Sequence, residues 1–251
     1  MALLLLNNAE SQSSGTTVTA GNSGGTDANA FNAVVIGANM TETFNNAHPA
    51  HGLNSFKAAL TSTATAITYL EWTSVSVGSP VTRLYGAFYF YLAAAAIPSS
   101  IRLIQFRNGA GLSAGISCTN GLQGFQFRNN ADTAIAPLTG TILANTLYRV
   151  EFDITFSATV GTGTLNVYVG DSLTLQGTSS PAATQNFGTQ CDGYRAGFCT
   201  ANFSTTSGDA IFLDDLNLNT TGLPGPGPYA LPVTVLESIQ IPRRRSRATS
   251  W

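Results

Sequence analysis

Hydrophobic and polar residues alternate along most of this chain with a spacing of two, which is the period of a β-strand. The segment Thr146–Phe156 shows the pattern most cleanly: its even positions from 148 to 156 are Tyr, Val, Phe, Ile and Phe, and its odd positions are mostly polar. One face of this strand should therefore lie on a core. The segment Leu84–Leu92 carries bulky residues at both parities, which predicts a central strand covered on both faces.

About a dozen segments carry a strand pattern, while sustained helical periodicity and internal repeats are nearly absent. The predicted strands are Leu3–Leu6, Phe31–Ile36, His51–Leu60, Ala66–Ser76, Leu84–Leu92, Ile101–Arg107, Leu112–Cys118, Gly121–Arg128, Thr146–Phe156, Thr164–Gly170, Tyr194–Thr200 and Ala210–Leu218. We expect the third and fourth of these strands to pair, and Asn120-Gly121 to form a two-residue hairpin turn. The pattern predicts an all-β, two-sheet antiparallel jelly-roll sandwich over residues 1–220.

The end of the chain has a different composition. Residues 221–230 contain the run Gly-Leu-Pro-Gly-Pro-Gly-Pro, which cannot continue a sheet and predicts an extended linker. Residues 231–251 hold one apolar strand with a basic end, which is too short to bury its own core. We expect this arm to bind other subunits by strand addition. Its predicted partner-binding residues are Val233, Val235, Ile239, Ile241, Arg243, Arg244 and Arg245.

The charge of the chain changes this picture little. Charged residues make up 10% of the sequence and the net charge is −2, so the domain is not expected to bind nucleic acid. The cluster Arg243–Arg247 could bind nucleic acid, anionic lipid or an acidic neighbouring subunit, or remain a solvated tail. No stretch has the ~20 apolar residues of a membrane span. The apolar start Met1–Asn7 is too short for a signal peptide and suits a first strand.

The three cysteines allow no full set of disulfides, so at least one thiol is free or pairs between chains. Cys191 and Cys199 could meet across a hairpin or stay two buried thiols. Metal-site cysteine spacing is absent, and no cofactor is expected.

Several strands together resemble the concanavalin A-like lectin and glucanase superfamily, including its laminin-G-like domains. The resemblance rests on His51-Gly-Leu-Asn-Ser-Phe-Lys57, Tyr85–Leu92, Tyr148-Arg-Val-Glu-Phe-Asp153 and Ile211-Phe-Leu-Asp-Asp-Leu-Asn-Leu218. It implies that the closing strand lies beside the first. The run from Asp214 to Gly222, followed by Gly-Pro repeats, is similar to minor tail proteins of phages that infect actinobacteria. That similarity implies a virion protein that could contact host glycans.

Two sets of residues suggest an enzyme, and each is incomplete. Glu151 and Asp153 share a strand face, as the two carboxylates of a retaining glycosidase do. The laminarinase-like pattern needs a third carboxylate where this chain has Thr155. Tyr194-Arg-Ala-Gly-Phe198 resembles a strand of alginate-lyase-like jelly rolls, but the histidine motif that those enzymes also need is missing. We therefore predict that the chain is not an enzyme.

Two further sets could bind a metal ion. His48 and His51 lie three residues apart and could converge on one ion, although a solvated loop explains them as well. Asp214 and Asp215 make a weak calcium candidate, because clustered carboxylates suit a hard cation. On a regular strand the two would point to opposite faces, so only a bulge would let both serve as ligands. No metal site is predicted.

Aromatic residues that could stack on sugar rings are the remaining candidates, and we name Trp72, Tyr85, Tyr89 and Tyr91 for this role. The leading functional prediction is a bacteriophage virion structural protein, a minor tail or capsid-decorating subunit assembled in the host cytoplasm. It would present a lectin-like surface to host glycans and form homo-oligomers through its arm. The alternatives are a carbohydrate-binding adhesin module and, third, a polysaccharide-degrading enzyme.

Overall fold

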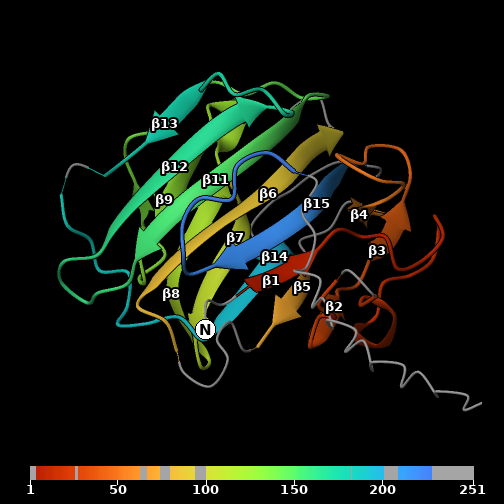
Figure 1. The fold of residues 1–251 in the computed structure, drawn as a ribbon, viewed down its shortest axis with the longest axis horizontal. Coiled ribbons are helices and arrows are strands. Elements are labelled where there is room, and N and C mark those ends of the chain that lie inside the picture. The colour runs from red at the N-terminus through yellow and green to blue at the C-terminus, as the bar shows by residue number, and fades with distance from the viewer. Residues whose placement is uncertain are drawn as a thin grey trace, which may run out of the picture.

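Two antiparallel β-sheets lie face to face in the computed structural model, which describes residues 4–25, 28–62, 67–73, 80–93, 100–181, 183–200 and 209–227 (Figure 1). The predicted all-β sandwich of jelly-roll type is confirmed. Within the described part of the chain, no helix is long and apolar enough to cross a membrane.

The sheet that faces the viewer in Figure 1 is called the front sheet here. Its strands are, in spatial order, β13 (Gly177–Ser179), β12 (Thr162–Val169), β11 (Leu147–Thr155), β6 (Arg83–Ala93), β15 (Ala210–Asn219), β4 (Ser55–Leu60) and β3 (Met40–Asn45). β1 (Leu4–Asn7) pairs with the second half of β15, and β4 pairs with its first half. The closing strand thus lies beside the first strand, as the resemblance implied.

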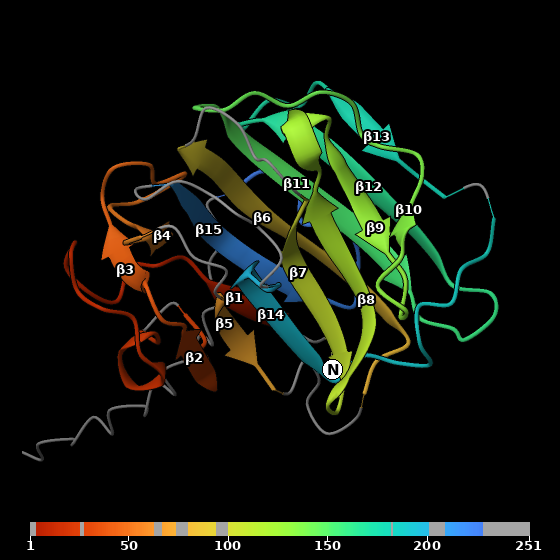
Figure 2. The ribbon, with the colours of Figure 1, turned by 180° about the vertical axis from the view of Figure 1, so that it is seen from behind.

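The opposite sheet, called the back sheet, faces the viewer in Figure 2. Its strands are, in spatial order, β10 (Ala134–Ile135), β9 (Phe125–Arg128), β8 (Gly111–Cys118), β7 (Ile101–Asn108), β14 (Gly193–Phe198), β5 (Thr68–Trp72) and β2 (Ala33–Ile36). Two short 3-10 turns, Ala20–Asn22 and Asn120–Leu122, complete the described elements.

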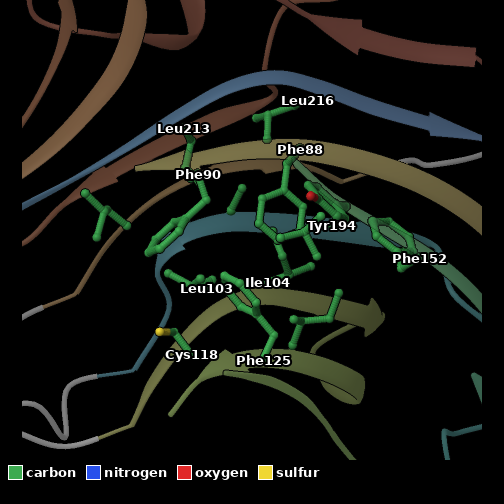
Figure 3. Close-up of a cluster of buried hydrophobic side chains, with 14 of the residues drawn as sticks. Phe88, Phe90, Leu103, Ile104, Cys118, Phe125, Phe152, Tyr194, Leu213 and Leu216 are labelled. Atoms are coloured by element: carbon green, nitrogen blue, oxygen red, sulfur yellow. The ribbon is translucent and has the colours of Figure 1, made fainter. Parts of the chain in front are cut away.

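The core fills the space between the two sheets, because each strand turns its alternate apolar residues inward. Figure 3 shows Phe88 and Phe90 of β6 and Leu213 of β15 directed toward Ile104 and Tyr194 of the back sheet. The predicted inward face of β11 is confirmed, since its even-numbered residues 148 to 154 are all buried. The predicted central position of the aromatic strand is also confirmed: β6 lies between β11 and β15.

Three details of the strand prediction were wrong. Residues 55–60 and 68–72 do not pair, because β4 belongs to the front sheet and β5 to the back sheet. Asn120 and Gly121 do not form a two-residue hairpin, since β8 ends at Cys118 and a 3-10 turn precedes β9. The short strands β3, β10 and β13 were not predicted. Pairing depends on contacts between distant segments, which local periodicity does not contain.

The three cysteines are all buried and free. Burial raises the pKa of each thiol to about 12, so these thiols stay protonated and unreactive at neutral pH. The predicted linker lies within the structure as far as Gly227, where the Gly227 backbone N–H donates to the Tyr89 hydroxyl at 3.0 Å. The chain therefore contacts the outer face of the front sheet as it leaves the domain.

Candidate functional site

Four arginines gather on the outer face of the back sheet, although they are far apart in the sequence. β7 contributes Arg102 and Arg107, β9 contributes Arg128 and β14 contributes Arg195. The strand register places them on one face: Arg195 is opposite Gln105, and Arg107 is opposite Gly193. Residues directly opposite each other on neighbouring strands point to the same side of the sheet. This set is called the arginine face below.

The arginine face stands out against an acidic domain. Seven of the eleven Lys and Arg residues precede residue 228, and four of those seven are on this face. The acidic partners here are few: Arg195 pairs with Glu71 at 2.7 Å, and Asp132 pairs with Arg102 and Arg128. The clustering of positive charge therefore favours an anionic ligand at this surface.

Buried polar groups on this face lack partners within the structure. They are Arg102 Nε, Arg107 Nε, Gln105 Oε1 and Ser117 Oγ. Ser117 is opposite Arg102 in the register, so the two share this outer face. A buried polar group without a hydrogen-bond partner costs free energy. Four such groups on one face distinguish it from an ordinary solvated surface.

Burial also sets the electrostatics of the arginines. It lowers the pKa of Arg102 to about 10, and neighbouring Arg128 and Arg107 push in the same direction. The pKa values of Arg107 and Arg128 are lowered as well, mainly by burial. The arginines remain charged at neutral pH, but their positive charge is poorly solvated and favours an anion nearby.

Sequence reasoning missed the arginine face. The sequence pattern that could have indicated it is the presence of charged or amide residues within strongly apolar strands. Examples are Arg102, Gln105 and Arg107 in β7. Such residues are unusual in a chain with only 10% charged residues. Their convergence with Arg128 and Arg195 depends on the strand order of the back sheet, which the sequence does not reveal.

The aromatic residues predicted to bind sugar lie elsewhere. Trp72 is buried in the core, where its indole N–H donates to Ala30 O at 3.0 Å, so it cannot stack on a ligand. Tyr89 is on the outer face of the front sheet but is also buried. Tyr85 and Tyr91 are half-buried there, with Arg83 over the Tyr85 ring and His48 stacked on Tyr91 at 3.7 Å. Each of these two rings thus has one face occupied.

Glu151 and Asp153 do share the outer face of β11, as predicted. However, Glu151 is buried and accepts a hydrogen bond from Arg149 Nε at 2.9 Å, and Asp153 pairs with Arg83 at 2.8 Å. Both carboxylates are therefore held by arginines rather than facing an open cleft. The structure offers no acid and nucleophile pair at these positions.

The two histidines do not converge on one site. His48 stacks on Tyr91, whereas His51 lies between two carboxylates: its Nδ1 is 2.5 Å from Asp215 Oδ2 and its Nε2 is 3.1 Å from Asp171 Oδ2. The Tyr89 hydroxyl donates to the other Asp171 oxygen at 2.5 Å. Among the described residues, no three His, Cys, Asp or Glu side chains are grouped so that they could hold a metal ion.

A bulge in β15 decides where Asp214 and Asp215 lie. The register against β6 shifts between Asp214 and Asn217, and Asp215 has a φ of 46°. Both aspartates therefore contact the same loop: Asp214 Oδ2 accepts a hydrogen bond from the Ala50 N–H at 2.8 Å, and Asp215 contacts His51. Burial raises the pKa of both aspartates, and their mutual repulsion raises that of Asp214 further.

Oxygen atoms that suit a calcium ion lie beside this bulge. Asp215 Oδ1 and Asn54 Oδ1 are buried and have no hydrogen-bond partner. Glu10 is adjacent, because its Oε1 accepts a hydrogen bond from the Asn54 N–H at 2.8 Å, and its charge raises the pKa of Asp215. Ca²⁺ takes carboxylate, amide and backbone oxygens, so these residues fit a calcium ion better than a transition metal.

The predicted partner-binding residues of the arm lie outside the described residues. These residues are Val233, Val235, Ile239, Ile241, Arg243, Arg244 and Arg245.

Comparisons with known proteins give a likeness of fold only. No protein-family model matches the chain, and no curated protein matches it. Among solved structures, "Cellulose induced protein, Cip1" matches with a TM-score of 0.54 and 13% identity, covering 76% of this chain and 90% of that one. A protein of unknown function from Shewanella oneidensis MR-1 matches with a TM-score of 0.43 and 15% identity, covering 87% of each chain.

A sialidase from Trypanosoma rangeli matches with a TM-score of 0.43 and 12% identity, covering 85% of this chain and 29% of the sialidase. The chain thus spans less than a third of that protein. The prediction that the chain is not an enzyme is corrected here: sialidases are among the matched structures, so this fold does not imply a non-catalytic role. At the level of fold, this β-sandwich is similar to Cip1.

Proposed function

We propose that this domain binds an acidic polysaccharide along the arginine face of the back sheet. The observation that carries the proposal is the clustering of Arg102, Arg107, Arg128 and Arg195 on one face together with buried polar groups that lack partners. The predicted carbohydrate-binding role is thereby kept, but its location moves from the tyrosines of the front sheet to the arginines of the back sheet.

The chemistry of guanidinium groups supports an anionic sugar. A guanidinium donates two parallel hydrogen bonds to a carboxylate or sulfate, which gives both affinity and orientation. Gln105 adds a buried amide to this face, and its Nε2 donates to Cys199 O at 3.0 Å. Gly115 lies between Arg128 and Gln105 in the register, and the Arg102 side chain lies over this glycine.

The arrangement also contains one aromatic ring, that of the buried Tyr69. The Arg195 guanidinium lies over the Tyr69 ring at 4.3 Å, and Tyr69 belongs to β5 at the same face. This contact holds the guanidinium in place, since cation–π stacking restricts its rotation. A fixed guanidinium loses less conformational entropy when it binds an anion.

The test is binding of the full chain to polygalacturonate, heparin and neutral dextran, measured by isothermal titration calorimetry at two salt concentrations. We expect the two acidic polymers to bind and dextran not to bind. The double variant Arg107→Gln/Arg195→Gln should weaken binding at least tenfold and reduce its salt dependence, because two contacts between a guanidinium and an anionic group of the polymer are lost. The matched control is Arg83→Gln, which removes an exposed arginine from the front sheet.

If neither acidic polymer binds, or if the double variant and the control bind alike, the proposal is wrong. Unchanged melting temperatures of the variants would show that both remain folded. The polysaccharide-degrading alternative is tested on the same mixtures. Hydrolysis would release new reducing ends, and a lyase would release unsaturated sugars, which absorb in the ultraviolet. Product release would add cleavage to the binding proposed here.

A virion role rests on the sequence alone. None of the solved structures named above is described as a virion protein, and the arm that would bind other subunits lies outside the described residues. The expected result is that the full chain forms an oligomer in light scattering and that a chain ending at Pro228 is a monomer. This cut keeps Gly227, which contacts Tyr89. If the full chain and the shortened chain contain the same number of subunits, the arm has no role in assembly.

A further inference from the structure

One end of the arginine face is hollowed into a small pocket. Its lining residues are Ser100, Arg102, Arg128, Asp132 and Thr200, and its volume is about 80 Å³. On this measure a water molecule needs about 10–15 Å³, so the pocket has room for one carboxylate or sulfate group.

The charges that line the pocket do not balance. Two guanidiniums share one carboxylate: Arg102 and Arg128 both pair with Asp132, and Arg128 Nε is 2.5 Å from Asp132 Oδ1. The Arg102 side chain is only 8% exposed, and its Nε has no acceptor. The Arg102 guanidinium is buried, has a donor without an acceptor, and shares its only carboxylate partner with Arg128. A second anion would therefore be favourable here.

Asp132 is positioned as a movable partner rather than a fixed one. It lies on the tight turn between β9 and β10 with a φ of 62°, and its side chain is 41% exposed. Asn129 closes the turn, since its side-chain oxygen accepts hydrogen bonds from the Ala131 and Thr133 N–H groups. The turn therefore holds its shape without the Asp132 side chain, which can rotate into solvent.

We propose that this pocket binds one anionic group, a carboxylate or sulfate, and that the group displaces the Asp132 side chain from the two arginines. This inference rests on the proposed function, because the group would belong to the acidic polysaccharide on the arginine face. The Arg102 and Arg128 side chains line the pocket beside Asp132, and Ser100 and Thr200 line the same space. Asp132 then acts as an internal competitor that weakens binding of any anion.

The experiment titrates the full chain with sodium sulfate and with sodium glucuronate against sodium chloride at constant ionic strength. The readouts are the Nε–Hε NMR signals of the arginines and the melting temperature. We expect the Arg102 and Arg128 signals to shift and saturate. Asp132→Asn should bind both anions at least tenfold more tightly than the native chain, because the competing carboxylate is gone.

Two variants make this result specific. Asp192→Asn removes a negative charge elsewhere on the surface, where Asp192 accepts a hydrogen bond from the Gly109 N–H, and should leave anion affinity unchanged. Arg102→Lys keeps the charge but loses the planar fork, and should abolish the gain in an Asp132→Asn background. A gain of the same size in Asp192→Asn would reduce the effect to net charge and overturn the proposal.

The outcomes separate this proposal from the proposed function. If polygalacturonate or heparin binds but Asp132→Asn leaves both small anions and polymers unchanged, the pocket proposal is wrong and the arginine face stands. If sulfate and glucuronate bind at Arg102 but no polymer binds, the polysaccharide function is wrong and the pocket takes a free small anion.

Discussion

Replacing Glu42 by glutamine is expected to stabilise the protein at pH 9 by a few kcal/mol and to change its stability little at pH 5. Glu42 lies in β3 with 2% of its surface exposed, and the hydroxyl of Thr68 is 3.1 Å from its Oε2. No arginine or lysine pairs with it among the described ion pairs. Burial raises the pKa of Glu42 to about 8, so its carboxyl is neutral in the folded protein at pH 7.

The direction of the pH effect follows from this raised pKa. The group has a pKa near 4.5 when it is solvated, so folding favours its protonated form. The stability contributed by Glu42 is fully present below about pH 4.5 and is lost as the pH rises through 8. Above pH 8 the folded protein must either hold a buried negative charge on Glu42 or protonate this carboxylate at a low proton concentration. Glutamine is neutral at every pH and keeps the contact with Thr68.

The measurement is urea denaturation of the native chain and of Glu42→Gln at pH 5, 7 and 9. The difference in the free energy of unfolding should grow with pH. The matched control is Glu151→Gln, because Glu151 is equally buried but pairs with Arg149 at 2.9 Å. That variant should be destabilised, since it leaves a buried guanidinium without its partner. A constant difference between the native chain and Glu42→Gln from pH 5 to pH 9 would contradict a raised pKa.

Calcium is expected to raise the melting temperature of this protein by roughly 5–10 °C. The physical reason is the two buried oxygen atoms Asp215 Oδ1 and Asn54 Oδ1, which lack any donor, together with the neighbouring, half-buried Glu10 carboxylate. A ligand at a hundred times its dissociation constant stabilises the folded state by about 2.7 kcal/mol. A domain of this size gains about 2–4 °C for each kcal/mol. A cation would also offset the repulsion between Asp214 and Asp215.

The measurement is thermal unfolding of the full chain in EDTA, in calcium and in magnesium. Magnesium should have little effect, because it requires a more regular shell of ligands. Asp215→Asn should remove most of the calcium response, whereas Asp153→Asn, which alters an exposed ion pair on the same sheet, should keep it. Equal melting temperatures in EDTA and calcium would show that these oxygens hold no calcium ion.

The candidate sites show how far the alternation of residues can be used. It placed the even positions of β11 on the core side, because the side-chain direction depends only on neighbouring residues along the strand. The same rule put Asp214 and Asp215 on opposite faces. The bulge in β15 breaks the rule locally, so both aspartates meet the loop at Ala50 and His51.

The sequence by itself determined the all-β class, most of the strands, the burial of their apolar faces and the position of β1 beside β15. All of these follow from local periodicity or from a family resemblance. Only the tertiary structure decided that Trp72 belongs to the core and that Arg102, Arg128 and Arg195 share one face. These arginines are neighbours because β9, β8, β7 and β14 lie side by side. That order is set by pairing between residues up to 92 positions apart, as with Ile104 and Ala196, which no local pattern encodes.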